Sequence, residues 1–164
     1  MKHILLIALA TVVGLTDAVA QKFGHLDTQE ILRSLPEVAV AEQQLQKLQA
    51  EFQEQIETMM MELQTKQTEF QEKGSTWPSA IRQQKELEYN QLAQGLQDFQ
   101  ISAENEIAQK QQELYLPIEK KLQEAINAVG EEHGFIYIFS SNIGVTLYEG
   151  GENVSGLVKT KLGI

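Results

Sequence analysis

The chain of 164 residues contains no cysteine, and this absence excludes several kinds of chemistry at once. Without a thiol there is no disulfide framework, no cysteine nucleophile and no cysteine-based zinc site. A chain of this kind suits an oxidising compartment, because it has no thiols to mispair. Long apolar runs are also missing, since none reaches the ~18–20 residues that span a bilayer. We therefore expect no integral membrane anchor.

Basic residues are scarce as well. The 13 lysines and arginines are outnumbered by 23 aspartates and glutamates, so the formal net charge is -10. Nucleic acids and anionic lipids require clustered lysine and arginine, so the balance argues against both as main partners. The length suggests one domain, or one domain with an appendage. The residue type in excess is glutamine, which fits the polar surface of helices and dilutes a hydrophobic core.

The first twenty residues have the pattern of a signal peptide. A short basic start at residues 1–3 precedes an apolar run at residues 4–15, and Ala18-Val19-Ala20 is a small-x-small cleavage site. We expect the mature chain to begin at Gln21 and to be exported into an envelope compartment or out of the cell. The alternative is an uncleaved N-terminal helix or anchor. No cysteine follows the site, so a lipoprotein anchor is excluded.

Two long helices are predicted in the middle of the chain. Ser34, Pro36 and Glu37 form a helix start in which Ser34 and Glu37 make a capping box. Apolar residues then recur at steps of three and four up to about Lys73. Residues 74–79 break the pattern with glycine and proline. A second helix of roughly 50 residues follows, so the pair should fold back as an antiparallel coiled-coil hairpin with slight supercoiling.

Strand patterns lie on both sides of these helices. Residues 22–27 alternate weakly, residues 135–139 are aromatic and β-branched, and residues 145–148 read as the partner strand of a β-hairpin. A short helix is expected at residues 154–162. The class is thus α+β. The strand-bearing part of the chain outside the two long helices has about fifty residues, and it is too small to be stable alone. We expect oligomerisation through the strands, which would also cover their edges.

No constellation of residues supports catalysis, so we predict that the protein is not an enzyme and holds no cofactor or metal. The histidines lie far apart at positions 3, 25 and 133, and Glu131-Glu132-His133 lacks the second histidine of a zinc motif. There is no G-x-S-x-G sequence and no P-loop. The many carboxylates follow helix surfaces, where a solvated charged face is the simplest interpretation.

Three features are candidates for function, each beside a purely structural interpretation. An apolar strip on the first long helix could touch unfolded clients or could be coiled-coil core; three consecutive methionines cannot all face one seam, so at least one should be exposed. Trp77 could anchor a client or plug the hairpin end. Gly95 and Pro117 could be hinges or static bends. The strip comprises Phe52, Ile56, Met59, Met60, Met61 and Phe70.

Several motifs follow one another along the chain in a distinctive order and spacing. They are Phe23-Gly24-His25-Leu26-Asp27-Thr28-Gln29-Glu30-Ile31-Leu32, Leu35-Pro36-Glu37 with Ala41 and Leu45, Leu116-Pro117-Ile118 through Ala125-Ile126 and Val129, Gly134-Phe135-Ile136-Tyr137-Ile138-Phe139, Leu157-Val158-Lys159 and Leu162-Gly163-Ile164. In this order and spacing they resemble the Skp/OmpH family of periplasmic chaperones. The resemblance covers essentially all of residues 21–164.

The resemblance implies a homotrimer with a β-rich body, formed by residues 21–35 and 130–164, and a helical arm, residues 36–129, with its tip at 74–79. Such a trimer is an ATP-independent holdase that keeps unfolded outer-membrane proteins from aggregating in the periplasm. The alternative is an envelope coiled-coil scaffold with one fixed, folded partner. Strand residues expected in the trimer body are Phe23, Leu26, Phe135, Ile136, Tyr137, Ile138, Phe139, Val145 and Leu147.

The charge of the arm departs from the family pattern, in which lysine- and arginine-rich arms suit acidic clients and lipopolysaccharide. Residues 41–115 hold six basic and thirteen acidic side chains, a net charge of -7. Lipopolysaccharide binding through basic residues is therefore doubtful here. Apolar, methionine and glutamine contacts must do more of the holding.

Overall fold

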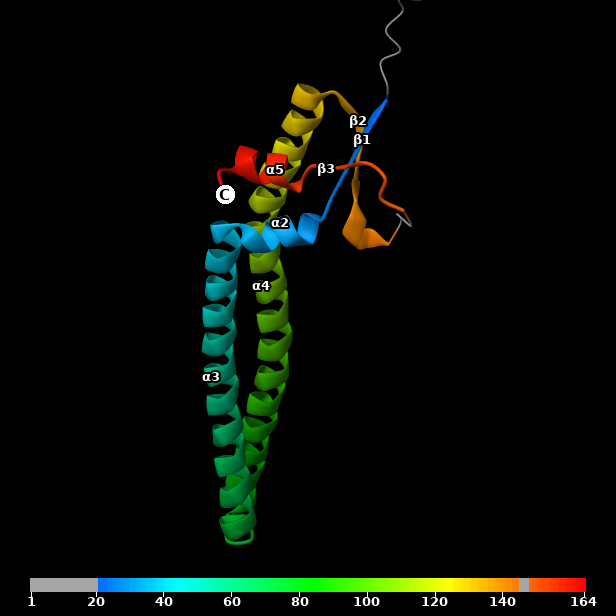
Figure 1. Ribbon diagram of the computed structural model, residues 1–164. Coiled ribbons are helices and arrows are strands. Elements are labelled where there is room, and N and C mark those ends of the chain that lie inside the picture. Colours follow the sequence, from blue (N-terminus) through cyan, green and yellow to red (C-terminus); the bar gives the residue numbers. More distant parts are fainter. Residues whose placement is uncertain (1–20, 145–147) are drawn as a thin grey trace, which may run out of the picture. The chain divides into compact units, whose positions relative to one another are not determined.

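The computed structural model describes residues 21–144 and 148–164 as long helices with a small sheet (Figure 1). The predicted signal peptide at residues 1–20 lies outside the described residues, as do Val145 and Leu147 of the predicted partner strand. The elements are, in chain order, β1 (Lys22–Leu26), α2 (Thr28–Ser34), α3 (Pro36–Lys73), α4 (Ser79–His133), β2 (Phe135–Ser140), the short 3-10 helix η1 (Ser141–Ile143), β3 (Glu152–Asn153) and α5 (Ser155–Leu162).

Contacts divide the described chain into two units. One unit combines residues 21–28 with Ala125–Gly163 and holds the sheet, and the other consists of Gln29–Glu124 with Ile164 and holds the long helices. α4 supplies residues to both. No described helix is both long enough and apolar enough to cross a membrane.

The predicted start of α3 was correct in position but wrong in its cap. α3 begins at Pro36, as predicted, but its N-cap is Leu35, which makes no side-chain capping bond. Ser34 is instead the last residue of α2, and its hydroxyl donates back to the Glu30 carbonyl at 2.8 Å. Hydroxyl side chains readily make this bond to the residue four positions earlier in a helix. Glu37 also leaves the predicted box, because its carboxylate accepts a hydrogen bond from Lys121.

The long-helix unit packs α3 against α4 through a narrow seam (Figure 1). The rings of Phe52 and Phe99 meet edge to face at 5.8 Å, and Lys66 pairs with Glu88 at 3.1 Å. Most seam residues remain half-buried, because two helices cannot enclose a side chain as three layers would. The fully buried apolar residues of this unit are Ile31, Leu35, Val38, Ala41, Ala103, Ile118 and Leu122.

α4 passes through both of the predicted interruptions. It is one helix of 55 residues with Pro117 inside it, and Gly95 also lies within its bounds. The backbone of Gly95 is not among the left-handed glycine conformations of the described chain. Gly95 therefore occupies an ordinary helical position. Its backbone conformation does not require glycine, so its effect there is the absence of a side chain.

The sheet joins strands from distant parts of the chain, whereas the predicted hairpin partner at residues 145–147 lies outside the described residues. β2 pairs with β1, and the strand order is β2-β1-β3 with both pairings parallel. Period-two alternation identifies a strand but says nothing about its partner, which here lies more than a hundred residues earlier in the chain. β3 is Glu152–Asn153, a segment that was not predicted to be a strand, whereas Tyr148 lies in no strand and is 86% exposed.

One side of the sheet packs against helices in a small core. Leu26, Val129, Val154 and Val158 are buried there. Gly24 permits this approach, because a Cβ at its position would lie 3.0 Å from Val154 Cγ1 and 3.2 Å from the Phe135 ring. The other side of the sheet is therefore the one that is left for contacts beyond this core.

Candidate functional site

The outer side of the sheet presents a contiguous group of aromatic rings. Phe23, Tyr137 and Phe139 are 41%, 59% and 44% exposed, and we call these three residues the aromatic face. The register pairs Phe23 with Tyr137, which brings their rings into a parallel stack at 6.2 Å, and the Tyr137 and Phe139 rings lie at 5.9 Å. Adjoining exposed apolar side chains typically mark an interaction surface.

The predicted body residues divide between the two sides of the sheet. Ile136 is 51% exposed and Leu26 is buried. Ile138 lies on the inner side, because its Cδ1 is 3.7 Å from the position that a Cβ on Gly130 would take. Phe135 is half-buried beside Gly24, and the Lys22 ammonium lies 4.1 Å from its ring centroid. Strand identity alone could not separate interface residues from core residues here.

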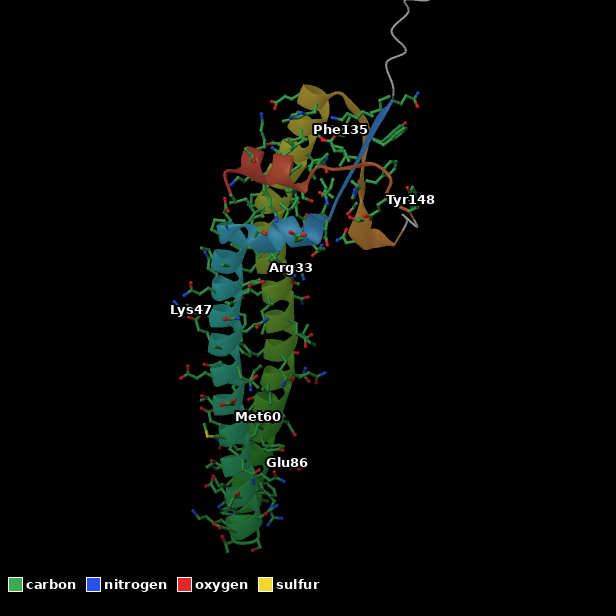
Figure 2. The ribbon with its side chains drawn as sticks, in the orientation of Figure 1. Arg33, Lys47, Met60, Glu86, Phe135 and Tyr148 are labelled. Atoms are coloured by element: carbon green, nitrogen blue, oxygen red, sulfur yellow. The ribbon has the colours of Figure 1, made fainter. Side chains whose placement is uncertain are left out.

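The methionine strip also divides. Phe52 and Ile56 are half-buried in the seam, whereas Met60 and Met61 are 54% and 64% exposed. Met60 projects from α3 in Figure 2. Met59 is half-buried and faces α4, where its Cε would lie 3.9 Å from a Cβ on Gly95. One methionine thus fills the space that Gly95 leaves, and its two neighbours point away from the seam.

The arm tip is closed by its own side chains. The rings of Phe70 and Trp77 meet edge to face at 5.6 Å, and the Lys85 ammonium lies 5.9 Å from the Trp77 ring centroid. Arg82 Nε donates to the Gly74 carbonyl at 3.0 Å. Trp77 remains half-buried, so one part of its ring packs and another part meets solvent.

Ion pairs join α3 to α4 along the arm. Lys66 lies 3.1 Å from Glu88, Lys85 lies 3.3 Å from Glu69, and Lys121 pairs with Glu37. Hydrogen bonds from Lys66 and then Gln84 lower the pKa of Glu88, and the Lys121 hydrogen bond lowers the pKa of Glu37. These groups are accessible to solvent, so each pair stabilises the arm only modestly.

Grooves follow the arm among the described residues, and the sequence did not reveal them. The root groove, about 520 Å³, is mostly apolar and is lined by Pro36, Val40, Leu114 and Pro117. Three further grooves, of about 620, 480 and 380 Å³, are named here by position. They are the mid-arm groove at Leu48 and Glu106, the outer groove at Met61 and Glu62, and the tip groove at Phe70 and Glu86.

The two described histidines lie in different surroundings. His25 Nδ1 lies 3.2 Å from a Glu149 carboxylate oxygen, and His133 lies near the Phe135 ring. Within residues 21–144 and 148–164, no set of three or more potential metal ligands is found.

Comparison with known proteins gives one family. The family model described as outer membrane protein (OmpH-like) matches residues 22–162. The matched range covers every described element, and the long helices with a small sheet are compatible with that fold. No curated protein matches the chain.

Proposed function

This chain belongs to the OmpH-like outer membrane protein family, and we propose that it is an ATP-independent periplasmic holdase for unfolded outer-membrane proteins. The family suggests a chaperone-type function in the periplasm, and it supports the choice of outer-membrane proteins as clients. The observation that carries the proposal is a long two-helix arm whose apolar side chains are only partly buried.

The proposed working form is a homotrimer assembled through the sheets. The aromatic face supports this assembly, because Phe23, Tyr137 and Phe139 form a contiguous apolar surface on a unit with a small core. Burying an aromatic side chain stabilises an interface by ~1.5–3 kcal/mol. Three copies would bury nine such rings and would cover the sheet edges as well. Residues 21–35 and 130–164 would form the body of the trimer.

The arm, residues 36–129, is proposed to act as an antiparallel hairpin that holds clients beside it. Met60 and Met61 supply adaptable apolar contacts, and exposed glutamines surround them. Contacts of this kind are individually weak, so a client is held while its segments still exchange. Export through a cleaved signal peptide at residues 1–20 would place the trimer in the periplasm.

The test uses purified residues 21–164. An unfolded outer-membrane β-barrel protein is diluted from urea into the protein, and the particle mass is followed by light scattering. We expect a soluble particle of three chains and one client under conditions where the client alone precipitates. Aggregation of the client beside an intact trimer would refute the holdase and leave the assembly standing.

The alternative is an envelope scaffold that spaces a fixed, folded partner. The closed tip favours it, because the Phe70–Trp77 contact and the Lys85–Glu69 pair would stiffen a spacer. A scaffold should bind one folded protein and ignore unfolded barrels, so the same scattering experiment separates the two functions.

A further inference from the structure

The basic residues of the arm are largely engaged by carboxylates. Between residues 41 and 115 there are six lysines and arginines, and four of them lie within 4 Å of a glutamate. The distances are 3.7 Å for Lys47–Glu51, 3.1 Å for Lys66–Glu88, 3.3 Å for Lys85–Glu69 and 3.4 Å for Lys110–Glu113. Arg82 contacts the Gly74 carbonyl. The positive charge is therefore mostly matched within the arm, and the excess charge is negative.

Part of that excess lies in the grooves. Glu106 in the mid-arm groove, Glu62 in the outer groove and Glu86 in the tip groove are exposed, and none has an ion pair or hydrogen bond among the described residues. Glu86 is labelled on α4 in Figure 2. The lysines that line these grooves already face other glutamates. Each groove thus holds one carboxylate that is available to a partner.

The same grooves hold apolar surface beside that carboxylate. Met61 in the outer groove is 64% exposed, and Phe70 and Tyr89 in the tip groove are half-buried. Leu48 contributes to the mid-arm groove and is also half-buried. The root groove is different, because its one lining carboxylate, Glu37, is paired with Lys121. The mid-arm, outer and tip grooves thus combine apolar surface with unmatched negative charge, and the root groove does not.

We propose that these three grooves select unfolded segments in which apolar side chains adjoin lysine or arginine. An apolar side chain would pack on Met61, Phe70 or Leu48 while a neighbouring cation meets Glu62, Glu86 or Glu106. An acidic segment would gain the same apolar contact but would be repelled by the carboxylate. This inference rests on the proposed holdase function and adds the chemical class of segment that the arm prefers.

The test compares two labelled peptides with one apolar core of leucine and phenylalanine, flanked either by lysines or by glutamates. Binding to the chain is measured by fluorescence anisotropy at about 0.05 M and about 0.5 M salt. Each engaged carboxylate should favour the lysine peptide by about threefold, as exposed ion pairs do. The preference should shrink at the higher salt concentration, whereas binding through the apolar core persists.

Two variants of equal charge locate the effect. Glu62→Gln/Glu86→Gln/Glu106→Gln removes the groove carboxylates, and Glu42→Gln/Glu72→Gln/Glu104→Gln removes three exposed carboxylates that line none of the three grooves. The first variant should lose most of the preference for the lysine peptide, and the second should keep most of it. Equal losses in the two variants would overturn the groove assignment.

The unfolded-barrel experiment distinguishes this inference from the function on which it rests. If the chain keeps the barrel protein soluble and binds both peptides equally, the charge selection is refuted and the holdase stands. If the barrel protein aggregates and neither peptide binds, the holdase itself fails. Tighter binding of the glutamate peptide than of the lysine peptide would also refute the proposed charge selection.

Discussion

Replacing Gly95 with alanine should make the arm more stable. Gly95 lies in the interior of α4 at an ordinary helical position, where glycine costs about 1 kcal/mol relative to alanine. A Cβ at this position meets only the Met59 Cε, at 3.9 Å, which is an ordinary van der Waals contact. The substitution therefore adds helix propensity without a clash. The free energy of unfolding should rise by about 1 kcal/mol.

Circular dichroism at increasing temperature measures this change. For a chain of this size, a gain of about 1 kcal/mol corresponds to a Tm increase of about 3 °C. Ala108→Gly is the matched control, because it places a new glycine at an exposed position of the same helix and should lower the Tm by a similar amount. Gly95→Ala with a Tm below that of the parent would refute the packing argument, since it would mean that Met59 cannot accommodate the methyl group.

The same variant tests the hinge prediction. If Gly95 lets the arm bend around clients, Gly95→Ala should reduce the largest client kept soluble in the scattering assay while it raises stability. If Gly95 is only a packing position opposite Met59, stability should rise and the range of clients should not change. Hydrogen exchange of the amides around Gly95 provides a separate readout, and protection that stays at the parent level would argue against any local stiffening.

Three further predictions address the other surfaces. Tyr137→Glu should yield folded monomers by light scattering, because Tyr137 belongs to the aromatic face. Tyr148→Glu is the control and should leave trimers, because Tyr148 is 86% exposed and lies outside the strands. Trimers in both variants would reject this interface. Met60→Gln/Met61→Gln should weaken client binding by about tenfold, since each lost apolar contact costs roughly 0.7 kcal/mol. The control Met60→Leu/Met61→Leu keeps the apolar contacts and should bind clients as the parent does. Undiminished client binding by the glutamine variant would mean that neither methionine contacts clients. The hydrogen bond from Lys66 lowers the pKa of Glu88 below its ordinary value of 4.5, so this pair stabilises the folded arm above pH 4.5 and loses its effect as the pH falls through the lowered pKa. Lys66→Met should flatten that part of a pH series of urea midpoints, and an unchanged slope would contradict the role of the pair.

The helices were predictable because local chemistry determines where they begin and end. Pro36 cannot extend a preceding helix and suits a first turn, and Gly74 with Pro78 interrupts the apolar spacing. α3 accordingly runs from Pro36 to Lys73. The seven-residue α2 was missed, because a segment of fewer than two helical turns is too short to show a repeating apolar pattern. That miss also explains the wrong cap, since Ser34 belongs to α2 and its hydroxyl was already engaged.

What the sequence could not supply depends on contacts between distant segments. β2 pairs with β1 across more than a hundred residues, and nothing within residues 135–140 identifies that partner. Ile138 lies on the inner side of the sheet and Tyr137 on the outer side, and this difference follows from the strand register and from the helix packed on one side. The unmatched glutamates of the grooves are equally hidden, because the partners of Lys66 and Lys85 are fixed by the alignment of α3 with α4.

The distribution of exposed apolar side chains separates two kinds of contact. On the sheet, Phe23, Tyr137 and Phe139 stack at about 6 Å, so a partner surface buries them together and their contributions accumulate. On the arm, exposed side chains such as Met61 and Ile101 are separated by polar residues. A client segment can therefore bury only one or two of them at a time, for a few kcal/mol at most.

Dissociation constants near the millimolar range correspond to about 4 kcal/mol, which permits rapid exchange of single segments. Tight holding then requires several arms to engage one chain, since linked weak contacts raise the effective affinity by orders of magnitude. In the proposed trimer the aromatic face would provide the permanent assembly, and the arm could bind weakly because that assembly would multiply its contacts.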